Sequence, residues 1–161
     1  LTLLPTGDPG QFDGTLRVRG VRVQDAPTIA ALLDAISVVG LLQQLDGQGL
    51  AFDEVDASFR LTPAQVIVSQ ASAVGPGLGI SVDGTYTLAS RQLDLQGVVS
   101  PFYLVNSIGS FLTRKGEGLI GFNFNIGGTV SAPQVLVNPL SALTPGMFRE
   151  IFRRPAPELS Q

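Results

Sequence analysis

Apolar and polar residues alternate along much of the chain, and this alternation predicts strands. Between residues 55 and 61, apolar side chains alternate with Asp56, Ser58 and Arg60, which is the two-residue period of a strand with one buried face. Turn-forming residues separate this segment from its neighbours, as in an antiparallel meander. Similar alternation, or a short apolar run, predicts further strands at residues 15–23, 65–74, 79–88, 93–96, 122–126 and 134–138.

Three other segments repeat their apolar residues with a helical period. The longest predicted helix covers Pro27–Leu45, with Asp25 as a candidate cap. Its apolar residues spread over more than one stripe, so we expect it to be buried against a sheet. A second helix is predicted to open at Ser100-Pro101, and a third at Thr144-Pro145.

A spacing of 69 residues relates two parts of the chain. The glycine turn at residues 47–49 reappears at 116–118, and residues 65–77 share seven identities with residues 134–146. This pattern predicts a duplicated helix–turn–strand unit, over about residues 14–83 and 84–154. The predicted fold is α+β and mainly β: a curved antiparallel sheet of roughly eight strands with about three helices on its concave face. We expect a single domain over residues 1–154 and a disordered tail over 155–161.

Composition adds a constraint on the surface. Only 14% of the 161 residues are charged, against roughly 25% in an average globular domain, and the mean hydropathy is +0.31. Such a chain must expose apolar area or line a groove with it, although packing against the rest of a longer protein explains the deficit equally well.

The residue types that are missing exclude several kinds of chemistry. The chain has no histidine and no cysteine, so it lacks the commonest general base, the commonest metal ligand and any disulfide. The net charge is −3 and no basic stripe is evident, which argues against nucleic acid as a partner. We therefore expect neither an enzyme, nor a metal site, nor a cofactor.

Two patterns resemble functional motifs but are better explained by the fold. Asp53, Glu54 and Asp56 are a dense carboxylate cluster, as in glycoside hydrolases or calcium sites. Glu54 and Asp56 lie on the polar side of the predicted strand, opposite Val55 and Ala57, so a solvated strand face is the favoured interpretation. The glycine turns lack the Lys-Ser/Thr pair of a phosphate loop, and tight turns explain them better.

The predicted last helix combines apolar residues with arginines. This composition is typical of an interfacial helix that meets anionic headgroups. A helix that closes the end of the sheet, with its cations near its C-terminus, fits equally well. The candidate membrane or partner contacts are Phe148, Arg149, Ile151, Phe152, Arg153 and Arg154.

A series of short motifs carries a family resemblance. The most specific is Val137-Asn-Pro-Leu-Ser141 followed by Leu143 and Pro145-Gly146, and Leu93-Asp-Leu-Gln-Gly97 is another. In order and spacing these motifs resemble the C-terminal region of AsmA-like proteins, and more specifically the large envelope members of the YhdP-like group. The resemblance covers nearly the whole chain and is densest from residue 93 to residue 152.

This resemblance implies a periplasmic protein that is tethered to the inner membrane by an N-terminal segment outside these residues. The start at Leu1 rather than Met also leads us to expect a piece of a longer chain. Such proteins look like elongated β-grooves that carry phospholipid acyl chains between the envelope membranes, and the family supplies no catalytic residues. The implied partners are phospholipid, the N-terminal part of the same chain, and an outer-membrane or envelope component.

The lipid interpretation assigns an apolar groove, or its end-cap, to this module. The alternative is a structural or assembly module that caps a β-solenoid or docks an outer-membrane partner without binding lipid. The residues that we expect to line the groove are Ile36, Val39, Leu42, Phe59, Leu104, Ile108, Phe111, Phe122 and Phe124.

Overall fold

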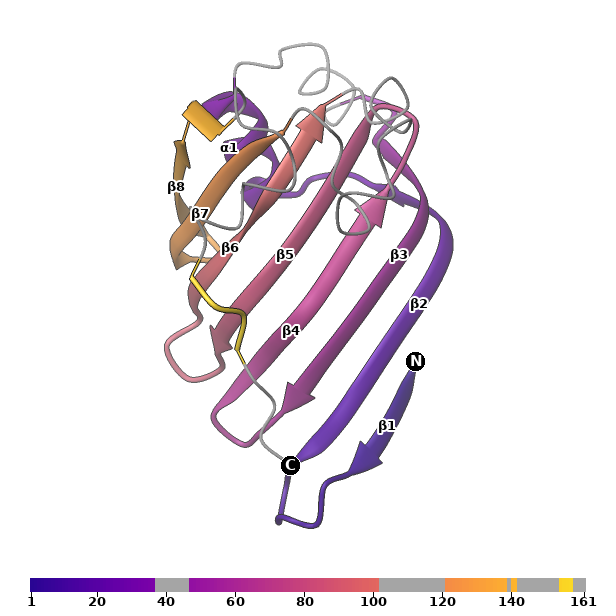
Figure 1. Cartoon of the computed structure of the whole chain (residues 1–161), viewed down its shortest axis with the longest axis vertical. Coiled ribbons are helices and arrows are strands. Elements are labelled where there is room, and N and C mark those ends of the chain that lie inside the picture. Colours follow the sequence, from indigo (N-terminus) through magenta and orange to yellow (C-terminus); the bar gives the residue numbers. More distant parts are fainter. Residues whose placement is uncertain (37–46, 102–120, 139, 142–153, 158–161) are drawn as a thin grey trace.

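The computed structural model describes residues 1–36, 47–101, 121–138, 140–141 and 154–157. In these residues, eight strands form one antiparallel sheet in which each strand pairs with its neighbours in sequence (Figure 1). The helix α1 (Pro27–Ala35) connects in sequence to the end of β2. The strands are β1 (Thr2–Pro5), β2 (Phe12–Val23), β3 (Leu50–Leu61), β4 (Gln65–Val74), β5 (Leu78–Thr87), β6 (Gln92–Pro101), β7 (Phe122–Thr129) and β8 (Ala132–Asn138).

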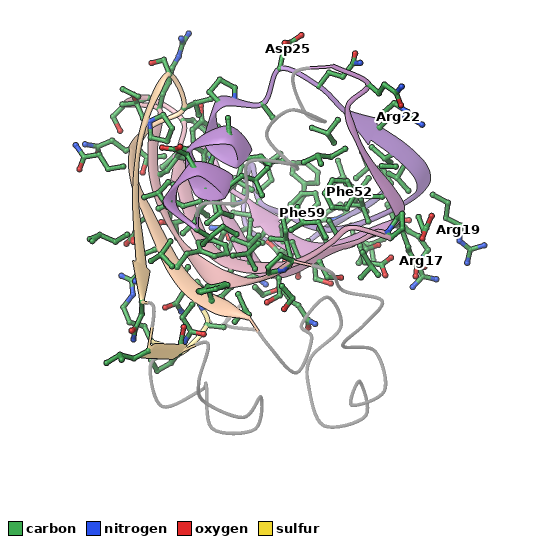
Figure 2. The ribbon with its side chains drawn as sticks, turned by 90° about the horizontal axis from the view of Figure 1, so that it is seen from above. Arg17, Arg19, Arg22, Asp25, Phe52 and Phe59 are labelled. Atoms are coloured by element: carbon green, nitrogen blue, oxygen red, sulfur yellow. The ribbon has the colours of Figure 1, made fainter. Side chains whose placement is uncertain are left out.

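The strand register gives the sheet two chemically different faces. Val18 lies opposite Val55, and the row continues through Ala73, Ile80, Val99 and Phe122. We call the side that carries this row the apolar face, and Figure 2 shows the sheet curving around α1 on this side. The polar face carries the intervening residues, among them the row Arg17, Asp56, Ser72 and Ser81.

A bulge in β4 explains why this strand is apolar at both odd and even positions. The register of β4 shifts against both neighbours around Ser69 and Gln70, and the Ser69 hydroxyl donates a 3.0 Å hydrogen bond to the Ser58 carbonyl. The extra residue reverses the alternation. Val68 before the bulge and Ala71 after it therefore both face the apolar side.

In the β2–β3 pair, the alternation of apolar and polar side chains shifts by one residue without a β-bulge. Gly20 has φ +64°, and a glycine at a change in the alternation often marks a β-bulge. In the structure the register is the same before and after it, because Arg19 lies opposite Glu54 and Val21 lies opposite Phe52. The apolar–polar alternation therefore shifts in both strands at the same place. Beyond this place, the end of β2 bends over the apolar face (Figure 2).

Two glycines lie beneath aromatic rings from the paired strand. Gly14 lies opposite Phe59, and Gly97 lies opposite Phe124. A Cβ at Gly97 would collide with the Ser81 carbonyl oxygen and would come within 2.7 Å of the Phe124 ring. The ring therefore replaces the missing side chain and covers the strand at that point.

Helix α1 covers only part of the apolar face. Its fully buried side chains are Leu32 and Leu33, which join the core around Val99 and Phe124. Among the strands, α1 makes its closest contacts with β8 (Figure 1). The part of the face over β2–β5 is therefore left without a covering helix among the described residues.

The mainly β prediction is confirmed, but three helices on the concave face are wrong. One α-helix is present in the described part of the chain, and it ends at Ala35 rather than Leu45. Its N-cap is Ala26, without a side-chain hydrogen bond, rather than Asp25. The predicted second helix start, Ser100-Pro101, belongs to β6, since the apolar run that precedes it continues as a strand. The rest of that helix and nearly all of the third lie outside the described residues.

The duplicated helix–turn–strand unit is also wrong. Phe59 lies opposite Val68, so a repeat at 69 residues would pair Gly128 with Val137, whereas Val137 lies opposite Phe124. The physical reason is the turn: residues 62–64 connect β3 to β4, but residues 130–131 connect β7 to β8. The shared residues therefore reflect similar strands and turns in one continuous meander.

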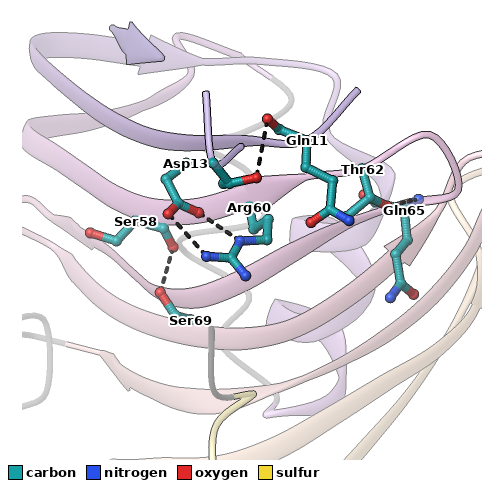
Figure 3. A network of polar contacts seen from close by, with 8 residues as sticks. Gln11, Asp13, Ser58, Arg60, Thr62, Gln65 and Ser69 are labelled. Atoms are coloured by element: carbon teal, nitrogen blue, oxygen red, sulfur yellow. Dashed lines mark hydrogen bonds and ion pairs between the residues drawn. The ribbon is translucent and has the colours of Figure 1, made fainter. Parts of the chain in front are cut away.

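Polar contacts close the end of the sheet where β2, β3 and β4 meet (Figure 3). Arg60 donates from Nε to Asp13 Oδ1 at 2.7 Å and from Nη2 to Asp13 Oδ2 at 3.0 Å. In the adjoining turn, the backbone amide of Gln65 donates a hydrogen bond to the Thr62 hydroxyl at 3.0 Å. The hydrogen bond from Arg60 holds the pKa of Asp13 below its ordinary value of 3.8.

We predict an acid-dependent effect of Asp13→Asn. Because the folded-state pKa of Asp13 is depressed, its ion pair stabilises the fold above the unfolded pKa and loses this effect as the pH falls through the folded pKa. The variant should be less stable than the wild type in urea at neutral pH, and the difference should shrink below about pH 4. The exposed Asp53→Asn is the control. A difference that stays constant from neutral to acidic pH would contradict the assignment.

The glycine–aromatic contact gives a second prediction. Gly97→Ala should lower the free energy of unfolding by about 1–3 kcal/mol, because its Cβ has no room against the Ser81 backbone. Gly127→Ala is the matched control, since the nearest atom to its Cβ would be 3.9 Å away. Urea unfolding of both variants measures the effect. Equal stabilities of the two variants would show that Gly97 is not tightly packed.

Candidate functional site

A groove of about 500 Å³ opens on the apolar face, between α1 and the bent end of β2. One wall is the α1 surface around Ile29 and Leu32, and the other is β2 from Leu16 to Val23. Strands β3–β7 form the floor. The floor residues are Phe52, Val55, Ala71, Ser72, Ala73, Ile80, Val82, Leu95, Phe124 and Ile126.

None of the described residues that line the groove has an ionisable side chain. Among the described lining residues, only Thr28 has a hydroxyl group on this side. The Ser72 hydroxyl belongs to the polar row beside Asp56, on the opposite face, and the remaining lining residues are apolar. An empty apolar cavity of this kind holds water poorly, because water needs two to four polar partners. The described lining of the groove therefore suits an apolar ligand.

Small side chains on the central strands create the depression in the floor. In one row, Ala57 and Ala71 stand between the larger Leu16 and Val82, and Ala73 occupies the next apolar position on β4. The surrounding walls are taller because they carry branched side chains. The groove thus results from a difference in side-chain volume across one sheet face, with α1 placed to one side of it.

The predicted lining residues are dispersed. Phe124 lies in the groove floor. Phe122 and Ile36 are half-buried and pack against the core. Phe59 lies on the apolar face over Gly14 rather than in the groove lining (Figure 2). Outside the described residues lie Val39, Leu42, Leu104, Ile108 and Phe111.

Sequence reasoning missed most of the residues that do line the groove. Ala71, Ala73, Ile80 and Val82 lie in strands that were correctly predicted, but the predicted lining consisted of larger aliphatic and aromatic residues. The available signal was the alanine at inward positions of a central strand, since small residues where a core needs volume indicate a cavity.

Of the candidate membrane or partner contacts, the structure describes one. Arg154 forms an ion pair with Asp94, with 2.8 Å between Nη2 and Oδ1, and this hydrogen bond lowers the pKa of Asp94. The remaining candidates, Phe148, Arg149, Ile151, Phe152 and Arg153, lie outside the described residues.

Glu54 and Asp56 of the carboxylate cluster lie on the polar face, as predicted. Asp56 accepts a 2.8 Å hydrogen bond from Arg17 Nε, and Glu54 is 3.8 Å from Arg17 and 3.9 Å from Arg19. These are ordinary cross-strand ion pairs. Within the described ranges, no three acidic, histidine or cysteine residues gather as a metal site would require.

No helix in the described part of the chain is both long and apolar enough to span a bilayer. The chain was also compared with protein-family models, with curated proteins and with solved structures, and none of these comparisons gave a significant match. The resemblance to AsmA-like proteins therefore depends on the motifs themselves.

We predict that a larger side chain changes the free energy of unfolding differently in the groove and in the closed core. Ala71→Leu adds side-chain volume next to empty space, so the free energy of unfolding should stay the same or rise by up to about 1 kcal/mol. Val99→Leu adds less volume at a fully buried position and should cost about 1–3 kcal/mol. Urea unfolding distinguishes the two. If Ala71→Leu is as destabilising as Val99→Leu, the floor of the groove is packed rather than open.

Proposed function

We propose that this chain is the C-terminal module of an AsmA-like periplasmic protein anchored in the inner membrane, and that its groove shields phospholipid acyl chains during transport between the envelope membranes. The observation that carries the proposal is the groove of about 500 Å³ whose lining is almost wholly apolar. The motifs from Leu93 to Ser141 support the family assignment and, through it, the periplasmic location.

The size and chemistry of the groove favour an acyl chain. Small-molecule sites usually measure about 300–1,000 Å³ and contain a few polar groups that fix the orientation of the ligand. This groove has a suitable volume, and its described lining offers only one polar side chain on the apolar face, that of Thr28. Each buried methylene group contributes about 0.8 kcal/mol, so a chain of several methylenes binds there without any directional contact.

The resembling motifs have structural roles that fit a module of this kind. Val137 lies in β8 opposite Phe124 of the groove floor. Next to it, the Asn138 side chain accepts a hydrogen bond from the Leu140 amide at 3.1 Å. Ser141 donates to the Asn138 carbonyl at 2.5 Å and accepts from the Asn123 amide at 2.7 Å. The motif thus forms a corner that fixes the end of β8 against β7.

A second candidate function is a cap or docking module without lipid. The outer strands expose large apolar side chains: Leu4 on β1 is 62% exposed and Leu136 on β8 is 75% exposed. Exposed apolar residues on edge strands favour pairing with further protein. This observation supports contact with the rest of a longer chain or with an envelope partner, and it is compatible with an empty groove.

Lipid extraction and native mass spectrometry distinguish the two functions. The chain is produced in a bacterial periplasm and purified without detergent, and the proposal predicts bound phospholipid at about one molecule per groove. Ala71→Trp should fill the groove and abolish the bound lipid. Gln70→Trp is the matched control, because Gln70 is the neighbouring residue on β4 and is exposed. It should retain lipid.

Three outcomes distinguish lipid binding in the groove from the cap or docking function. Lipid in the wild type and in Gln70→Trp, with none in a folded Ala71→Trp, supports the groove as the lipid site. Equal lipid in all three proteins places any lipid elsewhere and contradicts the proposal. A folded wild type without lipid favours the cap or docking module.

A further inference from the structure

The C-terminal segment 154–157 (Arg154, Pro155, Ala156 and Pro157) crosses the polar face of the sheet, on the side opposite the groove. It lies against β5 and β6, where it borders a small pocket of about 130 Å³. The sheet residues around this pocket are Asp83, Gly84, Thr85, Asp94 and Gln96.

Gln96 contacts the backbone of Arg154 in the way that a neighbouring strand would. Its Nε2 donates to the Arg154 carbonyl at 2.7 Å, and its Oε1 accepts from the Arg154 amide at 3.0 Å. Gln96 is buried, and its amide nitrogen also donates to Asp83 Oδ2 at 2.8 Å. Since Asp83 lies directly opposite Gln96 on β5, its carboxylate fixes the orientation of the carboxamide. The site is thus pre-organised to bind a peptide backbone.

Asp94 recognises the side chain of the same residue. The Arg154 guanidinium donates from Nη2 to Asp94 Oδ1 at 2.8 Å and from Nη1 to Asp94 Oδ2 at 3.3 Å. This two-point geometry matches the planar guanidinium, and a lysine ammonium does not reproduce it. The site therefore selects arginine at this position.

The prolines that follow reduce the cost of ordering the segment. Pro155 and Pro157 both line the pocket. Proline restricts φ and favours an extended polyproline conformation, so less conformational entropy is lost when such a segment binds. Known proline-rich recognition domains bind such extended segments in aromatic-lined grooves, whereas the described sheet residues at this pocket are polar or glycine and bind through hydrogen bonds.

From these contacts we propose that Asp83, Asp94 and Gln96 form a peptide-binding site for extended Arg-Pro-x-Pro segments, and that the C-terminal segment of the chain occupies this site as an intramolecular ligand. Two parts of the motif have their own recognition element, since Gln96 binds the backbone and Asp94 binds the arginine. The prolines form one side of the small pocket beside them. The site lies on the face opposite the groove and does not depend on lipid binding.

Amide hydrogen exchange on the intact chain tests occupancy. The Arg154 amide should be protected in the wild type, and Gln96→Leu should reduce this protection by roughly tenfold, the effect of losing a hydrogen-bonded pair. Asp94→Asn should reduce it less and leaves the buried residues unchanged, so it remains informative if Gln96→Leu is unstable. Gln92→Leu, an exposed residue on the same strand, is the control. An Arg154 amide that is unprotected in the wild type, or unaffected by both site variants, overturns the proposal.

Binding of a free peptide tests selectivity. In the Arg154→Ala variant of the 161-residue chain the intramolecular segment has lost its contact with Asp94, so added acetyl-Arg-Pro-Ala-Pro-amide should compete for the site. Because a tethered segment has an effective concentration in the millimolar range, the titration extends to about 10 mM peptide. A saturable shift of the Gln96 side-chain amide signal, several-fold weaker with the Lys-Pro-Ala-Pro peptide, supports the site. Equal shifts with both peptides, or no shift in the folded variant, contradict it.

Discussion

The structure depends on how one apolar sheet face is kept from water. An eight-stranded sheet with an apolar side needs a second layer, and the hydrophobic effect drives its formation. The described residues supply two partial covers: α1, nine residues long, over the β6–β8 side, and the bent end of β2 over the opposite side. The groove is the space between these covers. Its position follows from the short helix, the phase change at Gly20 and the small residues of β4.

The polar face has its own physical constraint. Several of its side chains, including Asp83, Gln96 and Asn123, are almost fully buried, and buried polar groups are costly unless they form hydrogen bonds. The bond from Gln96 to Asp83 and the pair between Gln96 and Arg154 meet this requirement at the centre of the sheet. The C-terminal segment is therefore part of what satisfies the polar face. The hydrogen bonds of Gln96 therefore connect β5, β6 and the segment 154–157, and hydrogen bonds in such a network strengthen one another.

Local pattern identified β2 to β8, but it identified neither β1 (Thr2–Pro5) nor how the sheet is covered. The alternation around Val55 and Phe59 predicted β3, because one face of that strand is solvated and the other is not. The 69-residue spacing was misleading, since identical residues in two hairpins with different turns occupy different registers. The bulge at Ser69 and the paired phase change at Gly20 depend on contacts between strands. The groove was least predictable, because it depends on the volumes of residues such as Ala71 and Val82 that are distant in sequence and adjacent in space.

An apolar lining also determines how a ligand would behave in the groove. Apolar attraction has no direction and scales with the area removed from water, so a flexible chain gains similar free energy at many positions along the same walls. Polar groups would fix one position and would slow release, since each leaves a buried partner unsatisfied when the ligand departs. The near absence of such groups around Ala71, Ala73 and Phe124 therefore favours a ligand that slides. A ligand that slides without a barrier suits passive transfer better than tight storage, because release then requires only a neighbouring apolar surface.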